Sequence, residues 1–96
     1  MSEFATSTER LLVQVRHWEQ PRWSAQGRAD RVYRLVQRLA DLAADAEGRP
    51  RREVPREHDM ILPDQIRVMA DDLLATGQAG ALAEATAAID AVRKQL

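Results

Sequence analysis

Apolar side chains recur at alternating steps of three and four residues along most of this chain, and nowhere do they alternate with polar side chains. The first spacing places side chains on one face of an α-helix, whereas strict alternation would indicate a half-buried strand. The clearest series contains Val32, Leu35, Leu39, Leu42 and Ala46. The sequence therefore predicts an all-α protein.

Proline and potential capping residues divide this pattern into helical segments. Thr6 and Glu9 have the spacing of a capping box, and Pro21 is expected to end the first helix because it lacks a backbone N–H. Ser24 is the expected N-cap of the second helix, and Pro63 suits the first turn of the third. The expected helices span residues 7–19, 24–47, 63–76 and 81–96.

The remaining segments complete a single domain of 96 residues. Residues 1–6 are expected to be disordered, and residues 48–60 to form a long irregular connection that is rich in arginine and proline. Gly77 lies at a tight corner, so the third and fourth helices should be antiparallel neighbours. The predicted architecture is a small helical bundle, either of four helices or of a three-helix core with the N-terminal helix packed across it.

The composition bounds the class of protein. The chain has no cysteine, which excludes disulfides, thiol nucleophiles and thiolate metal sites and favours a cytoplasmic location. The four glycines are isolated, so no glycine-rich phosphate loop is present and no cofactor is expected. No apolar run is long enough to span a bilayer, and no membrane contact is expected. Many of the apolar residues are alanine, and the small core that results favours homodimer formation.

Charge is divided unequally between the two halves. Residues 10–56 contain eleven arginines against six acidic residues, whereas residues 57–96 contain seven acidic residues against three basic ones. Halves of opposite sign suit contacts within one molecule or between two copies, and they suit nucleic acid no better.

The arginine-rich connection is the strongest candidate for a partner-binding site. Its arginines are Arg49, Arg51, Arg52 and Arg56. Such side chains donate charge-assisted hydrogen bonds to carboxylates or phosphates. The alternative is a solvated segment whose arginines pair with the acidic third and fourth helices.

Two tryptophans flank Pro21 in the stretch RHWEQPRW. Trp18 is expected to pack in the core, and Trp23 either staples the start of the second helix or lies exposed as an apolar contact for a partner. We include Trp23 in the predicted partner-binding site.

A second set of basic residues gives an alternative function. Arg31, Arg34 and Arg38 lie on the polar side of the second expected helix and could contact phosphates, which would make the protein a weak nucleic-acid binder. Ordinary ion pairs within the helix explain the same spacing.

A metal-dependent nucleotide hydrolase is the third hypothesis. The pair His58–Asp59 and the acidic pairs Asp41/Asp45 and Asp71/Asp72 are poor matches to the ligand sets of such enzymes, so no metal site and no catalytic residue is expected. The sequence favours a non-enzymatic module for protein–protein interaction or regulation, able to self-associate, with an unidentified protein partner.

Overall fold

The computed structural model describes residues 2–96 and contains helices without strands in this range. The helices are α1 (Glu3–Val15), α2 (Gln20–Ser24), α3 (Arg28–Ala46), the 3₁₀ helix η1 (Asp59–Ile61), α4 (Leu62–Ala75) and α5 (Ala79–Lys94). The predicted all-α class is confirmed. Within these residues, no helix is both long and apolar enough to cross a membrane.

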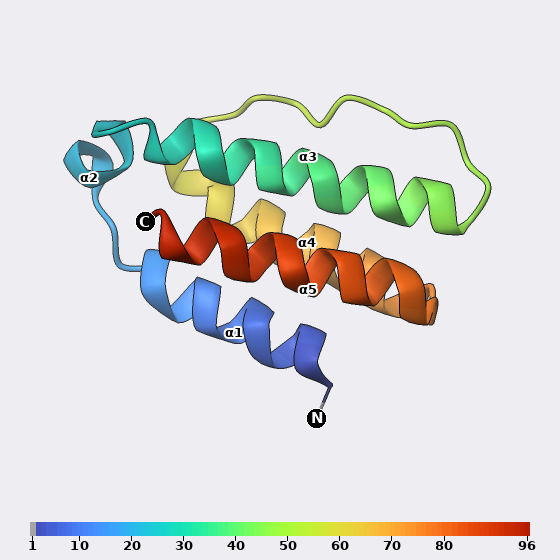
Figure 1. The fold of residues 1–96 in the computed structure, drawn as a ribbon. Coiled ribbons are helices and arrows are strands. Elements are labelled where there is room, and N and C mark those ends of the chain that lie inside the picture. The colour runs from blue at the N-terminus through green and yellow to red at the C-terminus, as the bar shows by residue number, and fades with distance from the viewer. Residues whose placement is uncertain (1) are drawn as a thin grey trace.

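The four long helices form a bundle (Figure 1). α3 packs against α4 and α5, and α1 packs against the same two helices from the other side. α1 and α5 run in one direction, while α3 and α4 run in the other (Figure 1). The bundle therefore consists of two parallel pairs, and its short fifth α-helix, α2, lies at one end.

The N-terminal segment differs from the prediction. α1 begins at Glu3, where Ser2 acts as the N-cap by accepting a hydrogen bond from the backbone N–H of Ala5 at 3.1 Å. Phe4 is buried in the core, and its burial favours a helix that starts before it. The expectations of disorder in residues 3–6 and of a helix start at Ser7 are wrong; Met1 lies outside the described residues.

The link between α1 and α3 also differs from the prediction. α1 ends at Val15, before Pro21, and Pro21 occupies the first turn of α2. Ser24 belongs to α2 and does not cap α3; Gly27 holds that position with φ of 69°, a left-handed conformation that glycine adopts without strain. The proline therefore starts a helix, in the position where its missing N–H costs least.

Residues 48–58, which we call the strap, run back along α3 in an extended path (Figure 1). Val54 is buried, and the Gln37 side chain accepts from the Val54 N–H at 2.8 Å and donates to the Arg52 carbonyl at 3.0 Å. The Tyr33 hydroxyl donates to the Val54 carbonyl. The predicted irregular connection is therefore present, but it ends at His58, because Asp59 and Met60 lie in η1.

The last two helices meet at the predicted corner. Pro63 lies in the first turn of α4, and Gly77 follows the helix with φ of 63°. α5 starts at Ala79, two residues earlier than predicted. α4 and α5 are antiparallel (Figure 1), but they make few direct contacts, and each packs mainly against α1 and α3.

Candidate functional site

Three of the four strap arginines are paired with carboxylates of the same chain. Arg49 contacts Glu47 at 2.6 Å, Arg51 contacts Asp45 at 2.7 Å, and Arg56 contacts Asp30 at 3.0 Å. The partners of Arg51 and Arg56 on α3 are acidic residues of the second expected helix, not of the third and fourth. Arg51 and Arg56 thus link the strap to α3, whereas Arg49 pairs with the nearby Glu47, which follows that helix.

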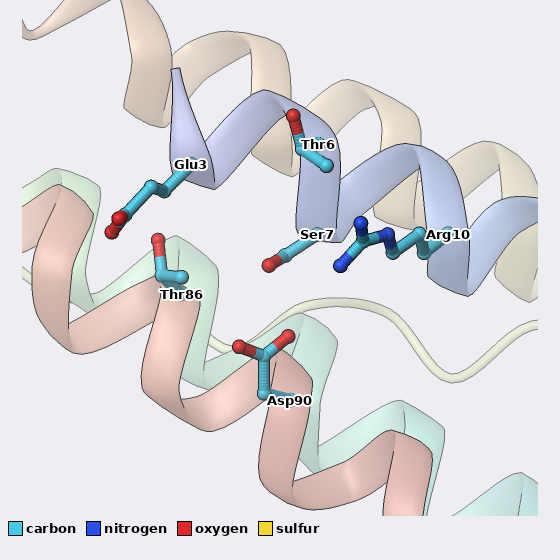
Figure 2. A pocket seen from close by; sticks show the side chains of 6 residues that line it. All are labelled: Glu3, Thr6, Ser7, Arg10, Thr86 and Asp90. Atoms are coloured by element: carbon cyan, nitrogen blue, oxygen red, sulfur yellow. The ribbon is translucent and has the colours of Figure 1, made fainter.

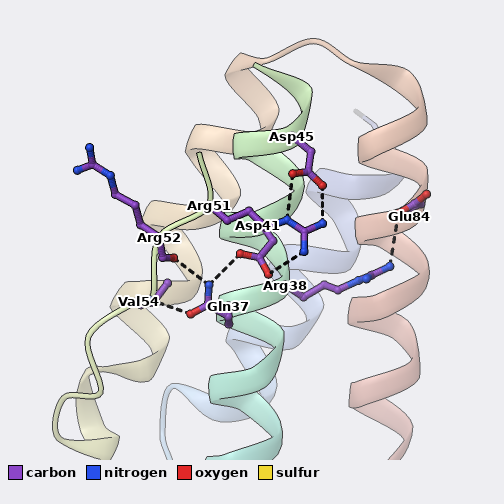
Figure 3. A network of polar contacts seen from close by, with 8 residues as sticks. All are labelled: Gln37, Arg38, Asp41, Asp45, Arg51, Arg52, Val54 and Glu84. Carbon is purple, nitrogen blue, oxygen red and sulfur yellow. Dashed lines mark hydrogen bonds and ion pairs between the residues drawn. The ribbon is translucent and has the colours of Figure 1, made fainter. Parts of the chain in front are cut away.

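The pair formed by Arg51 and Asp45 is bidentate (Figure 3). Two hydrogen bonds, of 3.0 and 2.7 Å, join the guanidinium to the two carboxylate oxygens, and Asp41 lies 3.9 Å from the same guanidinium. The hydrogen bonds from Arg51 lower the pKa of the Asp45 carboxyl, and Asp45 raises the pKa of Arg51 in return. Both side chains are exposed, so the pair contributes little to the free energy of unfolding.

Arg52 is the exception. Its guanidinium contacts no carboxylate among residues 2–96, and its side chain points away from α3, while its backbone carbonyl accepts the hydrogen bond from Gln37 (Figure 3). Of the predicted partner-binding arginines, Arg52 is the one whose charge has no partner in the part of the chain that the structure describes.

Both tryptophans are buried. Trp18 is 6% exposed and Trp23 is 1% exposed, and their rings meet edge to face with centroids 4.9 Å apart. The guanidinium groups of Arg22 and Arg28 each lie 5.7 Å from the centre of the Trp18 ring. The hypothesis that Trp23 is an exposed contact for a partner is therefore wrong, and it lies within α2 rather than before the start of α3.

The structure brings Arg31, Arg34 and Arg38 together along a groove between α3 and α5. The groove encloses about 290 Å³. The other residues that line it are Leu35, Ala88, Val92 and Gln95. An arginine-lined edge on α3 thus faces a mostly apolar wall on α5.

The three arginines of the groove differ in their contacts with the rest of the chain. Arg34 is exposed and has no hydrogen-bond or ion-pair partner among the described residues. Arg38 contacts Glu84 on α5 at 3.4 Å, with both side chains more than half exposed (Figure 3). Arg31 donates to the Gln26 carbonyl just before α3. Arg34 is therefore free, and Arg38 can exchange a weak contact for a stronger one.

A second cavity lies between α1 and α5 and is lined by polar side chains, several of them charged (Figure 2). It encloses about 410 Å³. Its lining residues are Glu3, Thr6, Ser7, Arg10, Thr86 and Asp90. The sequence analysis predicts none of them as site residues, because it starts the helix at Ser7, whereas Ser7 lies in the second turn of α1.

The acidic pairs considered for a hydrolase do not gather into one cluster in the described part of the chain. Within residues 2–96, no group of three or more histidine or acidic residues is placed to hold a metal ion. Asp41 and Asp45 both face Arg51, and Asp59 accepts a hydrogen bond from Gln20 at 2.9 Å. The contacts of these carboxylates therefore position the strap and η1.

Comparison with protein-family models, with curated proteins and with solved structures finds no match for this chain. The groove and the polar cavity are therefore the features of the molecule that bear on its function.

Proposed function

We propose that this protein is a non-enzymatic interaction module that binds an acidic, amphipathic helix of a partner protein in the groove between α3 and α5. The observation that carries the proposal is the alignment of Arg31, Arg34 and Arg38 along one edge of a groove whose opposite wall is apolar. Regulation of the partner through this contact is part of the proposal.

The two sides of the groove match the two faces of such a helix. Ala88 and Val92 are half-buried and offer apolar surface, and the small Ala88 side chain permits close approach of another helix. The guanidinium groups can form paired hydrogen bonds with carboxylates of the same ligand. Helix-in-groove recognition uses this combination of apolar contacts and charges.

The strap supports this surface indirectly. Arg51 pairs with Asp41 and Asp45, which follow Arg38 along α3 by one and two helical turns. Without that pairing, the two carboxylates would repel an acidic ligand at the adjacent end of the groove. Arg51 is thus not free for the partner, but it neutralises negative charge on α3 beside the groove.

Weak nucleic-acid binding is the second candidate, and the same row of arginines favours it. Single-stranded nucleic acids are commonly bound through exposed aromatic rings in addition to basic groups. Both tryptophans of this protein are buried, and Tyr33 is covered by Arg56 at 4.7 Å from its ring centre. The apolar wall of α5 has no counterpart on a phosphate backbone, so the acidic helix is the better fit.

The test uses a fluorescent synthetic peptide with glutamates on one helical face and leucines on the other. A peptide of the same composition, ordered so that no such face forms, is the comparison ligand, and a short DNA duplex is the third. Fluorescence anisotropy at low salt measures binding by the wild-type protein and by Arg34→Glu. Arg52→Glu is the matched control, because it makes the same charge change on an exposed arginine of the strap.

We expect the amphipathic peptide to bind more tightly than its comparison peptide. Arg34→Glu should weaken binding about tenfold or more, since one lost charge-assisted hydrogen bond is worth about 1.5–3 kcal/mol. Arg52→Glu should have little effect. An equal loss of peptide affinity in the two variants would show that net charge, and not the position of Arg34 in the groove, determines binding. Absence of peptide binding would overturn the proposal. Tighter binding of the duplex, with a steep salt dependence, would favour the nucleic-acid function instead.

A further inference from the structure

The polar cavity between α1 and α5 contains charged groups that have no partner among the described residues. Asp90 on α5 and Arg10 on α1 both line it, yet neither makes a hydrogen bond or an ion pair with any residue in the range 2–96. Glu3 is likewise without such a contact in that range. Three of the four strap arginines, by contrast, pair with carboxylates of their own chain.

Ser7 adds an independent observation. The residue as a whole is 5% exposed, and its hydroxyl makes no hydrogen bond with another of the described residues. The hydroxyl points into the cavity, toward Asp90 (Figure 2). The hydroxyl is not among the fully buried, unpaired polar atoms of the described residues, so it remains open to the cavity, and a group bound there can exchange a hydrogen bond with it.

The helices fix the order of the groups along the cavity. Glu3, Ser7 and Arg10 follow one another at steps of four and three on the same face of α1. Because α5 runs parallel to α1, Thr86 lies beside Glu3, and Asp90 lies opposite Ser7 and Arg10 (Figure 2). Glu3 and Arg10 are separated by about 10 Å along the helix axis. The cavity thus presents a carboxylate, then a hydroxyl beside a second carboxylate, then a guanidinium.

The charges of these groups define the ligand that would balance them. Two carboxylates and one guanidinium leave the cavity with one negative charge, and a ligand with two cationic groups and one anionic group neutralises it. The volume of about 410 Å³ falls in the range of small-molecule sites. We propose that this cavity binds a free basic α-amino acid such as lysine.

In this arrangement, the ligand carboxylate accepts hydrogen bonds from Arg10. The α-ammonium group donates to Asp90 and to the Ser7 oxygen, and the side-chain cation extends toward Glu3 and Thr86. The proposal does not depend on the groove between α3 and α5, because a different face of α5 lines this cavity.

Three ligands separate the contributions of the charged groups. Lysine has both ammonium groups and the carboxylate, cadaverine lacks the carboxylate, and norleucine lacks the side-chain ammonium. Isothermal titration calorimetry of the full chain with each ligand, at millimolar concentrations, measures binding. The variants are Asp90→Asn and Arg10→Gln, and the matched controls are Asp71→Asn and Arg16→Gln, which change exposed residues outside the cavity. Thermal unfolding establishes that each variant folds.

We expect lysine to bind at one site and to bind more tightly than cadaverine or norleucine. Asp90→Asn should weaken lysine binding at least tenfold, whereas Arg10→Gln should weaken lysine and norleucine binding but not cadaverine binding. The two controls should bind lysine as the wild type does. Absence of lysine binding, or equal losses in the variants and their controls, would overturn the proposal. Equal affinity for lysine and cadaverine would remove the role of Arg10 and would overturn it as well.

Discussion

At Trp23, the sequence left two alternatives open and the structure selects one. The ring is buried against Trp18, and its indole N–H has no hydrogen-bond partner among the described residues. Such an unpaired donor has a cost in free energy, so the burial of the ring must stabilise the fold by more than that cost. Trp23 is therefore a core residue that joins α2 to the bundle.

Replacing Trp23 tests this role. Trp23→Ala should lower the free energy of unfolding by about 3–5 kcal/mol, because it removes a large buried ring and leaves a cavity. Trp23→Phe should cost less, since a phenyl ring fills part of the space and the unpaired N–H is lost. Urea unfolding followed by circular dichroism measures both. An unchanged midpoint for Trp23→Ala would show that the ring does not support the fold, and Trp23→Phe keeps the test informative if the alanine variant does not fold.

The residues of the polar cavity show why a site can be missed in a sequence. Ser2, Thr6, Ser7 and Thr8 all have side chains that can cap a helix, so local chemistry does not decide among them. The burial of Phe4, a tertiary contact, favours Ser2. Only with that helix start do Glu3, Ser7 and Arg10 share one face, and only the packing of α1 on α5 brings Asp90 to them.

At the scale of elements, the strap was predictable in its extent but not in its path. Its prolines and lack of periodicity indicated an irregular segment, and the structure differs by only two residues at the end. The contacts of Gln37 with Arg52 and Val54, which fix the strap on α3, join residues far apart in sequence. For the same reason, the carboxylate partners of Arg51 and Arg56 could not be assigned from spacing.

The pair formed by Arg51 and Asp45 predicts a pH dependence. The hydrogen bonds from Arg51 lower the pKa of Asp45 from 3.8, so the folded chain binds its proton less readily than the unfolded chain. The resulting stabilisation is present above that value and is lost as the pH falls through the lowered pKa. Asp45→Asn should therefore be slightly less stable than the wild type at neutral pH and equally stable in strong acid.

Urea midpoints at neutral pH and at about pH 2–3 measure this difference. Asp71→Asn is the control, because Asp71 is exposed and has no ion pair in the range 2–96. A difference between Asp45→Asn and the wild type that persists unchanged in acid would contradict the assignment.

At the scale of the whole molecule, the helical pattern predicted a bundle but not its topology. The corner at Gly77 indicated two antiparallel helices in contact, whereas α4 and α5 lie mainly against α1 and α3. Periodicity shows which face of a helix is apolar, but it does not show which other helix covers that face. The long strap permits α3 and α4 to run parallel, a pairing that a short turn could not connect.

Self-association is the prediction that belongs to this scale. Val68 on α4 is 53% exposed, and Ile61 and Leu74 are also exposed at either end of that helix. We expect a second copy to cover part of this apolar surface, giving a reversible dimer in sedimentation velocity at micromolar to millimolar concentrations. Val68→Glu should shift the equilibrium to the monomer, and Val13→Glu on α1 is the matched control. A wild-type chain that stays monomeric throughout would contradict the prediction.

During synthesis, α1 must wait for the helices against which it packs. The ribosome releases α1 first, yet the helices that cover it, α4 and α5, come last. The apolar face formed by Phe4, Leu11 and Val15 therefore stays uncovered while the rest of the domain is synthesised. During that interval, this exposed apolar face can aggregate with other chains. Rapid completion of the chain or binding by a chaperone prevents that aggregation.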